Sequence, residues 1–432
     1  MDDISLLGED AALQAALVDL IPLLREIGLE VNLNKTVVLE PTPSISSAFG
    51  IRIAPTGARL LGAWIGNDVD AISFINEITS SFSPFFSAIA KLPAELGLPV
   101  LQKCGVPKMN HLCRTNAPAV TNEAAAIFDE LALNTFCQFA KLSPQVLDET
   151  SRLATHLPVS MGGVGITQFS RINSCAYDAS VLGNSTSQKS LVKEINKTLF
   201  GSMPDNFKQH LRRCKSDSDW LSAAVPSSYF HRALQIRILC AGVNSSWLCD
   251  CGFRCASERE AIVHALGCSK LQGVNASTRS SAVKEEIARF CKINSIPCSV
   301  EPMLLQNPDG TNIRADVRIS MPDADVYLDV VVATGGCKSH NHKSTTQLAS
   351  EKSQLKEDIY LRPVQSLGGS FITFFVETMG ELGPEAASLV KRLEKISISR
   401  EPKALRRRIG LTLHRCNGAI VSNAFRSLAV RY

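Results

Sequence analysis

The sequence lacks both a long apolar run and an amino-terminal targeting signal. No uninterrupted apolar stretch in its 432 residues approaches the ~20 residues that a membrane-spanning helix needs. The first residues are acidic, whereas a secretory signal starts basic and continues apolar. These absences exclude membrane-spanning and signal-bearing proteins, and they predict a soluble intracellular protein.

The sequence also has little net charge, +4, which by itself favours no class of partner. Its composition, 45% hydrophobic and 20% charged, is typical of a globular protein with about two to four domains. The 14 cysteines occur without a secretory signal, so they are expected to be thiols and metal ligands, not disulfides.

Positive charge is concentrated near the carboxyl terminus. Residues 391–432 carry 11 Lys and Arg against 2 Asp and Glu, with Arg406, Arg407 and Arg408 at the centre. A basic end of this kind suits contact with nucleic-acid phosphates. The same charges would equally suit a solvated helix face, and charge alone does not decide between the two.

The stretch Arg314–Thr334 is typical of a β-hairpin. Its first half alternates apolar and charged residues, its second half is β-branched and mostly apolar, and Pro322 marks a turn between them. A loop of Met321–Ala324 would place Asp316 opposite Asp329, with roughly 5 Å between their Cβ atoms. A divalent cation would relieve the repulsion between the two carboxylates. The alternative is an Asp316 that flanks a turn and an Asp329 that is exposed at a sheet edge.

A second cluster has the residue types of a zinc site. The pattern C-x-C-x12-H-x3-C supplies four ligands of the kind that close a tetrahedral zinc centre. The ligands would be Cys249, Cys251, His264 and Cys268. Cys255 is either a spare thiol or a replacement for Cys249. Reduced core cysteines are the alternative, and a zinc knuckle here could contact nucleic acid or serve as a structural staple.

Around the hairpin, strands alternate with helices. This order predicts a small mixed sheet with helices on its faces. The expected helices are Asp10–Ile27, 72–89, 123–139, Ser281–Ile293, Thr345–Ile359 and 386–396, and a further strand is expected at 370–377. In the helix that follows the hairpin, Leu348, Leu355 and Ile359 are expected to form the buried stripe, with Lys352 inside it and Lys356 at its margin.

The amino-terminal segments resemble the reverse transcriptases of non-LTR retrotransposons. Asp2-Asp3 looks like the end of the F/Y-x-D-D catalytic hairpin, Gly28-Leu29 to Lys35 looks like the segment that follows it, and Leu61-Gly62 to Ile65-Gly66 resembles the primer-grip segment. The resemblance implies a partial palm and then a helical thumb and connector. The first metal-binding aspartate of the family has no counterpart, so this chain alone is not expected to polymerise DNA. Asp2, Asp3 and Lys35 are then remnants, or half of a site completed by a separate or upstream polymerase portion.

The carboxyl-terminal third resembles the restriction-enzyme-like endonuclease of site-specific members of the same family, which carry a C-C-H-C knuckle just before it. The family pattern is a basic residue, Pro-Asp, about a dozen residues, a second acid and a lysine. Here Ala315 replaces the proline, and Val331 stands where the lysine is common. The retrotransposon branch takes its lysine from the next helix, shortly before a tyrosine. Lys356 with Tyr360 fits that spacing, whereas helical geometry prefers Lys352.

The resemblance therefore implies Mg²⁺ held by Asp316 and Asp329, and a lysine that orients the attacking water. It implies a mixed α+β chain with a palm remnant at 1–70, a thumb and connector at 71–240, a zinc knuckle at 241–275, an endonuclease at 276–400 and a basic tail at 401–432. A nuclear protein that nicks a DNA target and binds the element RNA is expected. The alternatives are a decayed, inactive nucleic-acid-binding remnant and a structural protein without metal.

Overall fold

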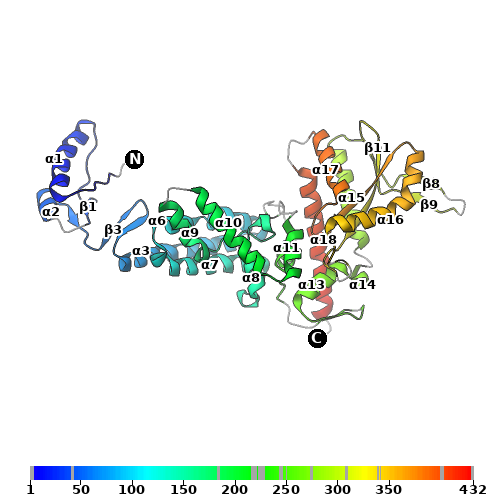
Figure 1. Cartoon of the computed structure of the whole chain (residues 1–432), viewed down its shortest axis with the longest axis horizontal. Coiled ribbons are helices and arrows are strands. Elements are labelled where there is room, and N and C mark those ends of the chain that lie inside the picture. Colours follow the sequence, from blue (N-terminus) through cyan, green and yellow to red (C-terminus); the bar gives the residue numbers. More distant parts are fainter. Residues whose placement is uncertain are drawn as a thin grey trace. The chain divides into compact units, whose positions relative to one another are not determined.

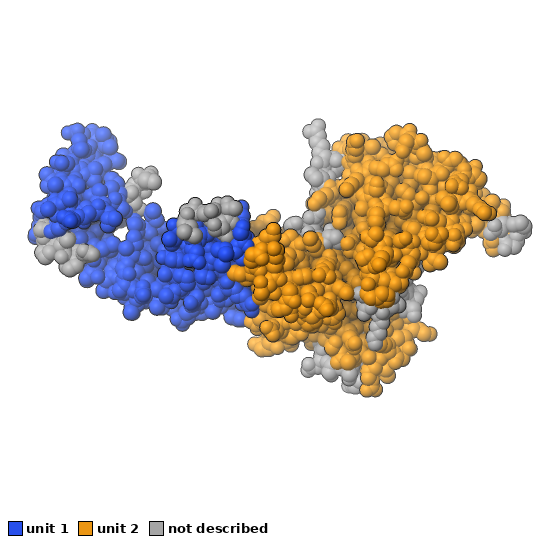
Figure 2. Space-filling model, viewed as in Figure 1, with its two compact units in different colours: residues 1–85, 107–130, 168–192 blue, residues 86–106, 131–167, 193–432 orange. Residues whose placement is uncertain are grey.

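The chain is a mixed α+β protein in which helices predominate (Figure 1). The computed structural model describes residues 4–39, 43–181, 185–215, 221, 229–242, 247–249, 251–272, 276–306, 310–337, 340, 342–398 and 403–429. They divide into two compact units, each assembled from separate segments (Figure 2). Unit 1 comprises 1–85, 107–130 and 168–192, and unit 2 comprises 86–106, 131–167 and 193–432.

Unit 1 begins with the predicted amphipathic helix. Its elements are α1 (Asp10–Glu26), β1 (Val37–Val38), α2 (Pro43–Phe49), β2 (Arg52–Ile53), β3 (Gly57–Leu60), β4 (Ala63–Gly66), α3 (Asp68–Ser81), α6 (Lys108–Thr115) and α9 (Phe169–Val181). The helices α4 (Ser83–Ala90), α7 (Pro118–Ala140) and α10 (Ser185–Ser202) each contribute residues to both units. The sequence places five apolar residues at helical spacing on one face of α1, and all five are only half-buried: Leu13, Leu17, Leu20, Ile21 and Leu24. No residue of this helix is fully buried.

The sequence of residues 1–8 also predicts the second half of a β-hairpin, but residues 4–8 form no strand, so this prediction is wrong for the described residues. The Leu61-Gly62 pair turns the β3–β4 hairpin, with both residues at positive φ (49° and 84°). A two-residue turn of this kind matches the twist of the strands that it joins.

The helical part of unit 2 contains a turn that requires glycine. Its elements are α5 (Ala94–Val100), a π-helical turn (Leu101–Gly105), two 3₁₀ turns (Pro144–Val146 and Val159–Met161), α8 (Glu149–His156), α11 (Asp205–Lys215) and α12 (Phe230–Ile238). Gly162 has φ +92°, and a Cβ there would lie 2.0 Å from the carbonyl oxygen of Leu211. The close approach of α11 explains this glycine without a catalytic role.

The predicted mixed sheet lies in the rest of unit 2. The elements are β5 (Trp247–Leu248), β6 (Arg254–Cys255), α13 (Glu258–Gly267), α14 (Ser269–Gln272), α15 (Ala276–Ile293), β7 (Cys298–Val300), β8 (Met303–Gln306), β9 (Asn312–Arg314), β10 (Val317–Ser320), β11 (Asp325–Ala333), α16 (Thr345–Ser366), β12 (Ser370–Glu377), α17 (Pro384–Ile396) and α18 (Ala404–Ala429). The strand order is β12-β11-β10-β7. β11 and β12 are parallel and are joined through α16, whereas the other two pairs are antiparallel.

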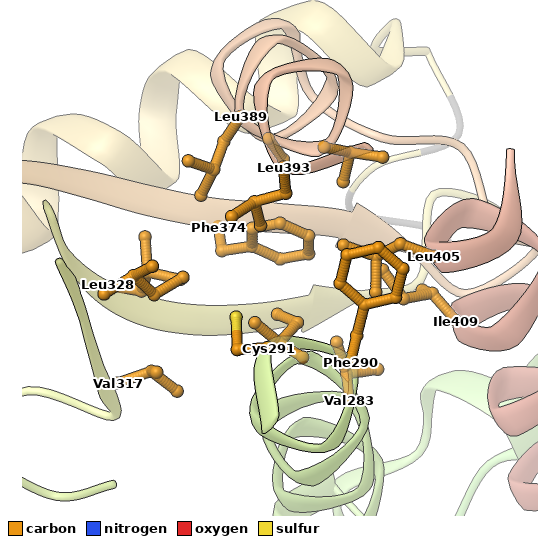
Figure 3. Packing of buried hydrophobic residues seen from close by; sticks show 14 of the residues in the cluster. Val283, Phe290, Cys291, Val317, Leu328, Phe374, Leu389, Leu393, Leu405 and Ile409 are labelled. Atoms are coloured by element: carbon orange, nitrogen blue, oxygen red, sulfur yellow. The ribbon is translucent and has the colours of Figure 1, made fainter. Parts of the chain in front are cut away.

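Each face of this sheet packs on different helices. Side chains from β10, β11 and β12 pack with α15, α17 and α18 on one face (Figure 3). On the other face, Tyr327 and Phe375 belong to two smaller clusters with residues of α16. Asp329 alternates with Leu328 and Val330 along β11, so its side chain belongs to the face that α16 covers.

Two predictions about this region are wrong. Leu355 and Ile359 are 59% and 49% exposed, because α16 turns Leu348, Ala349 and Val364 toward the sheet instead. The segment 401–432, expected to be a basic tail, forms α18 over 404–429. Leu405, Ile409 and Leu413 of α18 are completely or almost completely buried in the core.

Among the described residues, every helix is too short or too polar to cross a lipid bilayer.

Candidate functional site

The predicted hairpin register is confirmed along β10. Ser320 pairs with Asp325 and Val317 pairs with Leu328, so the intervening loop is Met321–Ala324. One position beyond the strand the register shifts by one residue, because the amide of Asp316 donates to the carbonyl of Leu328 over 2.8 Å, so Asp316 and Val317 both face Leu328. Asp316 therefore does not lie directly opposite Asp329 as the sequence predicts, but its carboxylate reaches the next residue of β11, Val330, and its charge interacts with that of Asp329.

Asp316 is held in place by the backbone of the neighbouring strand. Its Oδ2 accepts a hydrogen bond from the amide of Val330 over 2.7 Å. Burial raises the pKa of this carboxyl, and the negative charge of Asp329 raises it further, although the Val330 amide opposes both effects. The two aspartates thus carry an electrostatic cost that a bound cation would relieve.

Lys356 is the lysine that the structure brings to Asp329. Its Nζ lies 2.9 Å from Asp329 Oδ2 as an ion pair, without the alignment of a hydrogen bond. Asp329 is only 7% exposed, so an unpaired charge there would be costly. Lys352, one turn earlier on α16, is half-buried, and the structure shows no ion pair between it and either aspartate. The geometry therefore selects Lys356 from the two predicted lysines.

Tyr360 also lies at this site. Its ring stacks on Phe371 of β12 with centroids 5.1 Å apart, and the Lys356 ammonium lies 5.7 Å from the ring centroid. Burial raises the pKa of Tyr360 to about 12, and the charge and hydrogen bond of Asp329 act in the same direction. Tyr360 is therefore a neutral hydroxyl beside the aspartate pair at physiological pH.

Sequence reasoning missed Lys284 altogether. This residue of α15 places its Nζ 2.8 Å from Glu301 Oε1 and 3.7 Å from Asp316 Oδ1. Glu301 follows β7, and its amide donates to the carbonyl of Asp316 over 2.9 Å. Lys284 could have been noticed in the sequence because it lies near Val283 and Ile287. These two buried residues set which face of α15 packs on the core.

The Cys and His cluster can hold a metal ion such as zinc. One ligand atom from each of Cys249, Cys251, His264 and Cys268 lies within 4.8 Å of the other three. The sulfurs of Cys249 and Cys268 are 3.6 Å apart, and the Cys251 sulfur is 3.3 Å from Nε2 of His264. Tetrahedral bonds of about 2.3 Å from zinc to each sulfur place two sulfurs about 3.8 Å apart. The donor set and its spacing therefore fit a structural zinc ion.

Local structure explains how the four ligands converge. Cys249 and Cys251 flank the turn between β5 and β6. His264 and Cys268 are one helical turn apart at the end of α13, which Ser257 caps by accepting from the amide of Glu260. Cys255 is fully buried and lies outside the set of four ligands. The interpretation that uses Cys249 as a ligand is the one that the geometry favours.

The described residues among the remaining predictions belong to neither of these two clusters. Asp2 and Asp3 fall outside the described residues. Lys35 is exposed in a turn, where its amide donates to the carbonyl and side chain of Asn32. The side chains of Arg406, Arg407 and Arg408 are half-buried, and Arg408 pairs with Glu286 of α15 over 3.1 Å. At least one arginine of this group is thus paired with an acid of the same chain.

Comparison with protein-family models and with curated proteins finds no match to this chain.

Proposed function

We propose that this chain is a retrotransposon-derived, reverse-transcriptase-like protein whose remaining chemistry is the Mg²⁺-dependent nicking of DNA. The observation that carries the proposal is the β10–β11 hairpin that brings Asp316 beside Asp329, with Lys356 2.9 Å from Asp329. Two neighbouring carboxylates and one lysine are the groups that metal-assisted phosphodiester hydrolysis requires. The palm remnant, the knuckle and the endonuclease remain parts of the same proposal, and they rest on the sequence resemblance.

The residues of the site have distinct roles in the proposed reaction. Asp316 and Asp329 would hold Mg²⁺, an ion that proteins commonly bind through one or two carboxylates. When bound, the ion would lower the pKa of a coordinated water and neutralise charge on the phosphate. The Val330 amide holds Oδ2 of Asp316 in place by a hydrogen bond of 2.7 Å. Lys356 orients Asp329 and supplies a positive charge for the phosphate oxygens.

Zinc has a separate, structural role in the proposal. The four ligands would close a tetrahedron without an open position, and a closed site of this kind performs no hydrolysis. The knuckle would support α13 and offer a contact for nucleic acid. The DNA target, the element RNA and a nuclear location are likewise proposed from the resemblance.

Nicking of supercoiled plasmid by the zinc-loaded protein tests the function. We expect nicked circles in Mg²⁺ or Mn²⁺, and a loss of at least about 100-fold in Asp329→Asn, since one ligand of the ion is removed. Circular dichroism of the variant should match that of the wild type. Absence of metal-dependent nicking on plasmid and target DNA would contradict the proposal. Salt-dependent DNA binding that persists without cleavage would instead favour the inactive nucleic-acid-binding remnant.

A further inference from the structure

Three carboxylates occupy neighbouring positions across the end of the sheet. Val317 pairs with Val300 on one side, and the amide of Glu301 donates to the carbonyl of Asp316, so Glu301 lies beside Asp316. On the other side of Asp316 lies β11, where the carboxylate of Asp316 accepts from the amide of Val330 and its charge interacts with that of Asp329. The order across the sheet is therefore Glu301, Asp316, Asp329, with Asp316 in the middle.

A buried hydroxyl extends this row. Thr373 of β12 pairs with Asp329 in parallel register and is only 2% exposed. Its Oγ1 has no hydrogen-bond partner among the described residues. Phe371 and Phe375, two positions away on either side, pack in the clusters that involve α16, so Thr373 belongs to the same face as Asp329. A buried polar atom without a partner is costly, and it indicates a ligand or water beside Asp329.

The middle position of Asp316 is what a two-metal centre would require. In such centres the ions lie about 3.5–4 Å apart and share a bridging ligand. If the first ion lies between Asp316 and Asp329, a second would lie between Asp316 and Glu301. That place is where the Lys284 ammonium lies, 2.8 Å from Glu301 and 3.7 Å from Asp316.

The surroundings of Lys284 keep its ammonium at this place. Its side chain is only 12% exposed, whereas that of Glu301 is 58% exposed. Val283 and Ile287 anchor α15 in the core on either side of Lys284, so the helix cannot readily withdraw the lysine. A divalent ion that entered between Asp316 and Glu301 would meet a positive charge at contact distance, which repels it strongly in a partly buried site.

We infer that Lys284 makes this a one-metal centre: a single divalent ion binds between Asp316 and Asp329, and the Lys284 ammonium replaces a second ion between Asp316 and Glu301. The inference rests on the proposed function. It makes Lys284 a positioning residue that fixes the number of ions, and Thr373 a hydrogen-bond partner for water on the single ion. Lys356 lies at the opposite end of the acid pair and does not occupy the second place.

Mn²⁺ titration of the zinc-loaded protein, with free Mn²⁺ followed by electron paramagnetic resonance, tests this without relying on cleavage. We expect one bound Mn²⁺ in the wild type and a second in Lys284→Met, in which an apolar chain of similar length preserves the packing of the stem. The double variant Lys284→Met, Glu301→Gln should return to one ion. Lys292→Met, at an exposed position of the same helix, is the matched control and should bind one ion as the wild type does.

The outcomes separate this inference from the proposed function. The one-metal centre would be overturned by two bound ions in the wild type, or by one ion of unchanged affinity in Lys284→Met. Neither result would contradict the proposed metal-dependent nicking. No bound ion in the wild type would overturn both. Wild-type binding of one ion without any nicking would sink the proposed nuclease but leave the role of Lys284 in metal binding intact.

Discussion

Lys356 and Lys352 lie on the same helix, yet only Lys356 reaches the carboxylates. The ion pair of 2.9 Å ties Lys356 to Asp329, a residue that is 7% exposed. We expect Lys356→Met to lower the plasmid-nicking rate by about 100-fold or more, because the charge that stabilises the phosphate is lost. Lys352→Met is the matched control and should change the rate by less than about threefold. Equal losses of nicking rate in the two variants would show that the role given to Lys356 is wrong.

Asp129 of α7 shows how burial alone creates a pH dependence. Its two carboxylate oxygens accept from the amides of Phe169 and Ser170, at the start of α9. Burial nevertheless raises its pKa from 3.8 to about 6. The folded protein thus holds this proton more tightly than the unfolded chain, so the free energy of unfolding falls as pH rises through this range, by up to about 3 kcal/mol.

Chemical denaturation between pH 4 and 8 measures this contribution. Asp129→Asn is expected to flatten the pH dependence in that range, because the amide does not titrate. Asp178→Asn, at an exposed position of α9, should keep the wild-type slope. If Asp129→Asn and the wild type showed parallel curves, burial of this carboxyl would not be the cause.

At the scale of elements, α18 shows that a strongly basic segment can still carry a row of buried apolar residues. Leu405, Ile409 and Leu413 are four residues apart, which is the spacing of one helix face, and all three join the sheet core (Figure 3). Leu413→Ala should lower the free energy of unfolding by about 2–5 kcal/mol through loss of buried surface and formation of a cavity. Arg415→Ala, at an exposed position of the same helix, should change it by less than about 0.5 kcal/mol. A similar small change in both would mean that α18 is a dispensable tail.

The strands of the sheet could be predicted because their local pattern matches their burial. β12 runs over the predicted residues 370–377, and Pro322 marked the turn before β11, whose assumed loop Met321–Ala324 agrees with the pairing of Ser320 with Asp325. Leu355 and Ile359 misled the interpretation of α16, since their four-residue spacing suits a buried stripe. The face of α16 that carries Leu355 and Ile359 is exposed. A different face of this helix lies toward the sheet, and from it Lys356 pairs with Asp329.

At the scale of the whole molecule, the chain order gives little information about which segments pack together. Each compact unit draws on three separated segments, so the five-part linear division stays a prediction. The Cys and His pattern was sufficient to find the metal cluster, because ligand spacing on a turn and a helix is local. Lys284 could not be found in that way, since its partners Glu301 and Asp316 are 17 and 32 positions further along the sequence.

The Cys and His cluster and the four-stranded sheet meet at the carbonyl group of Leu266. The oxygen of Leu266, between the ligands His264 and Cys268, accepts from Nη2 of Arg279 over 3.0 Å and from Oγ1 of Thr334 over 2.9 Å. Thr334 directly follows β11, the strand that carries Asp329. An ion that fixes the end of α13 therefore also fixes the end of that strand.

Removal of zinc should loosen both sides of this junction. We expect amide hydrogen exchange in α13 and around Thr334 to accelerate at least about tenfold, equivalent to ~1.4 kcal/mol of local opening energy. Exchange in the β3–β4 hairpin of unit 1 should stay unchanged and serves as the internal control. Cys268→Ser should lose its zinc and reproduce the faster exchange that is expected when a chelator removes the metal. Cys104→Ser, at an exposed cysteine, should keep both its zinc and its protection from amide exchange. Acceleration confined to α13, with Thr334 unaffected, would show that the carbonyl of Leu266 does not couple the two sites.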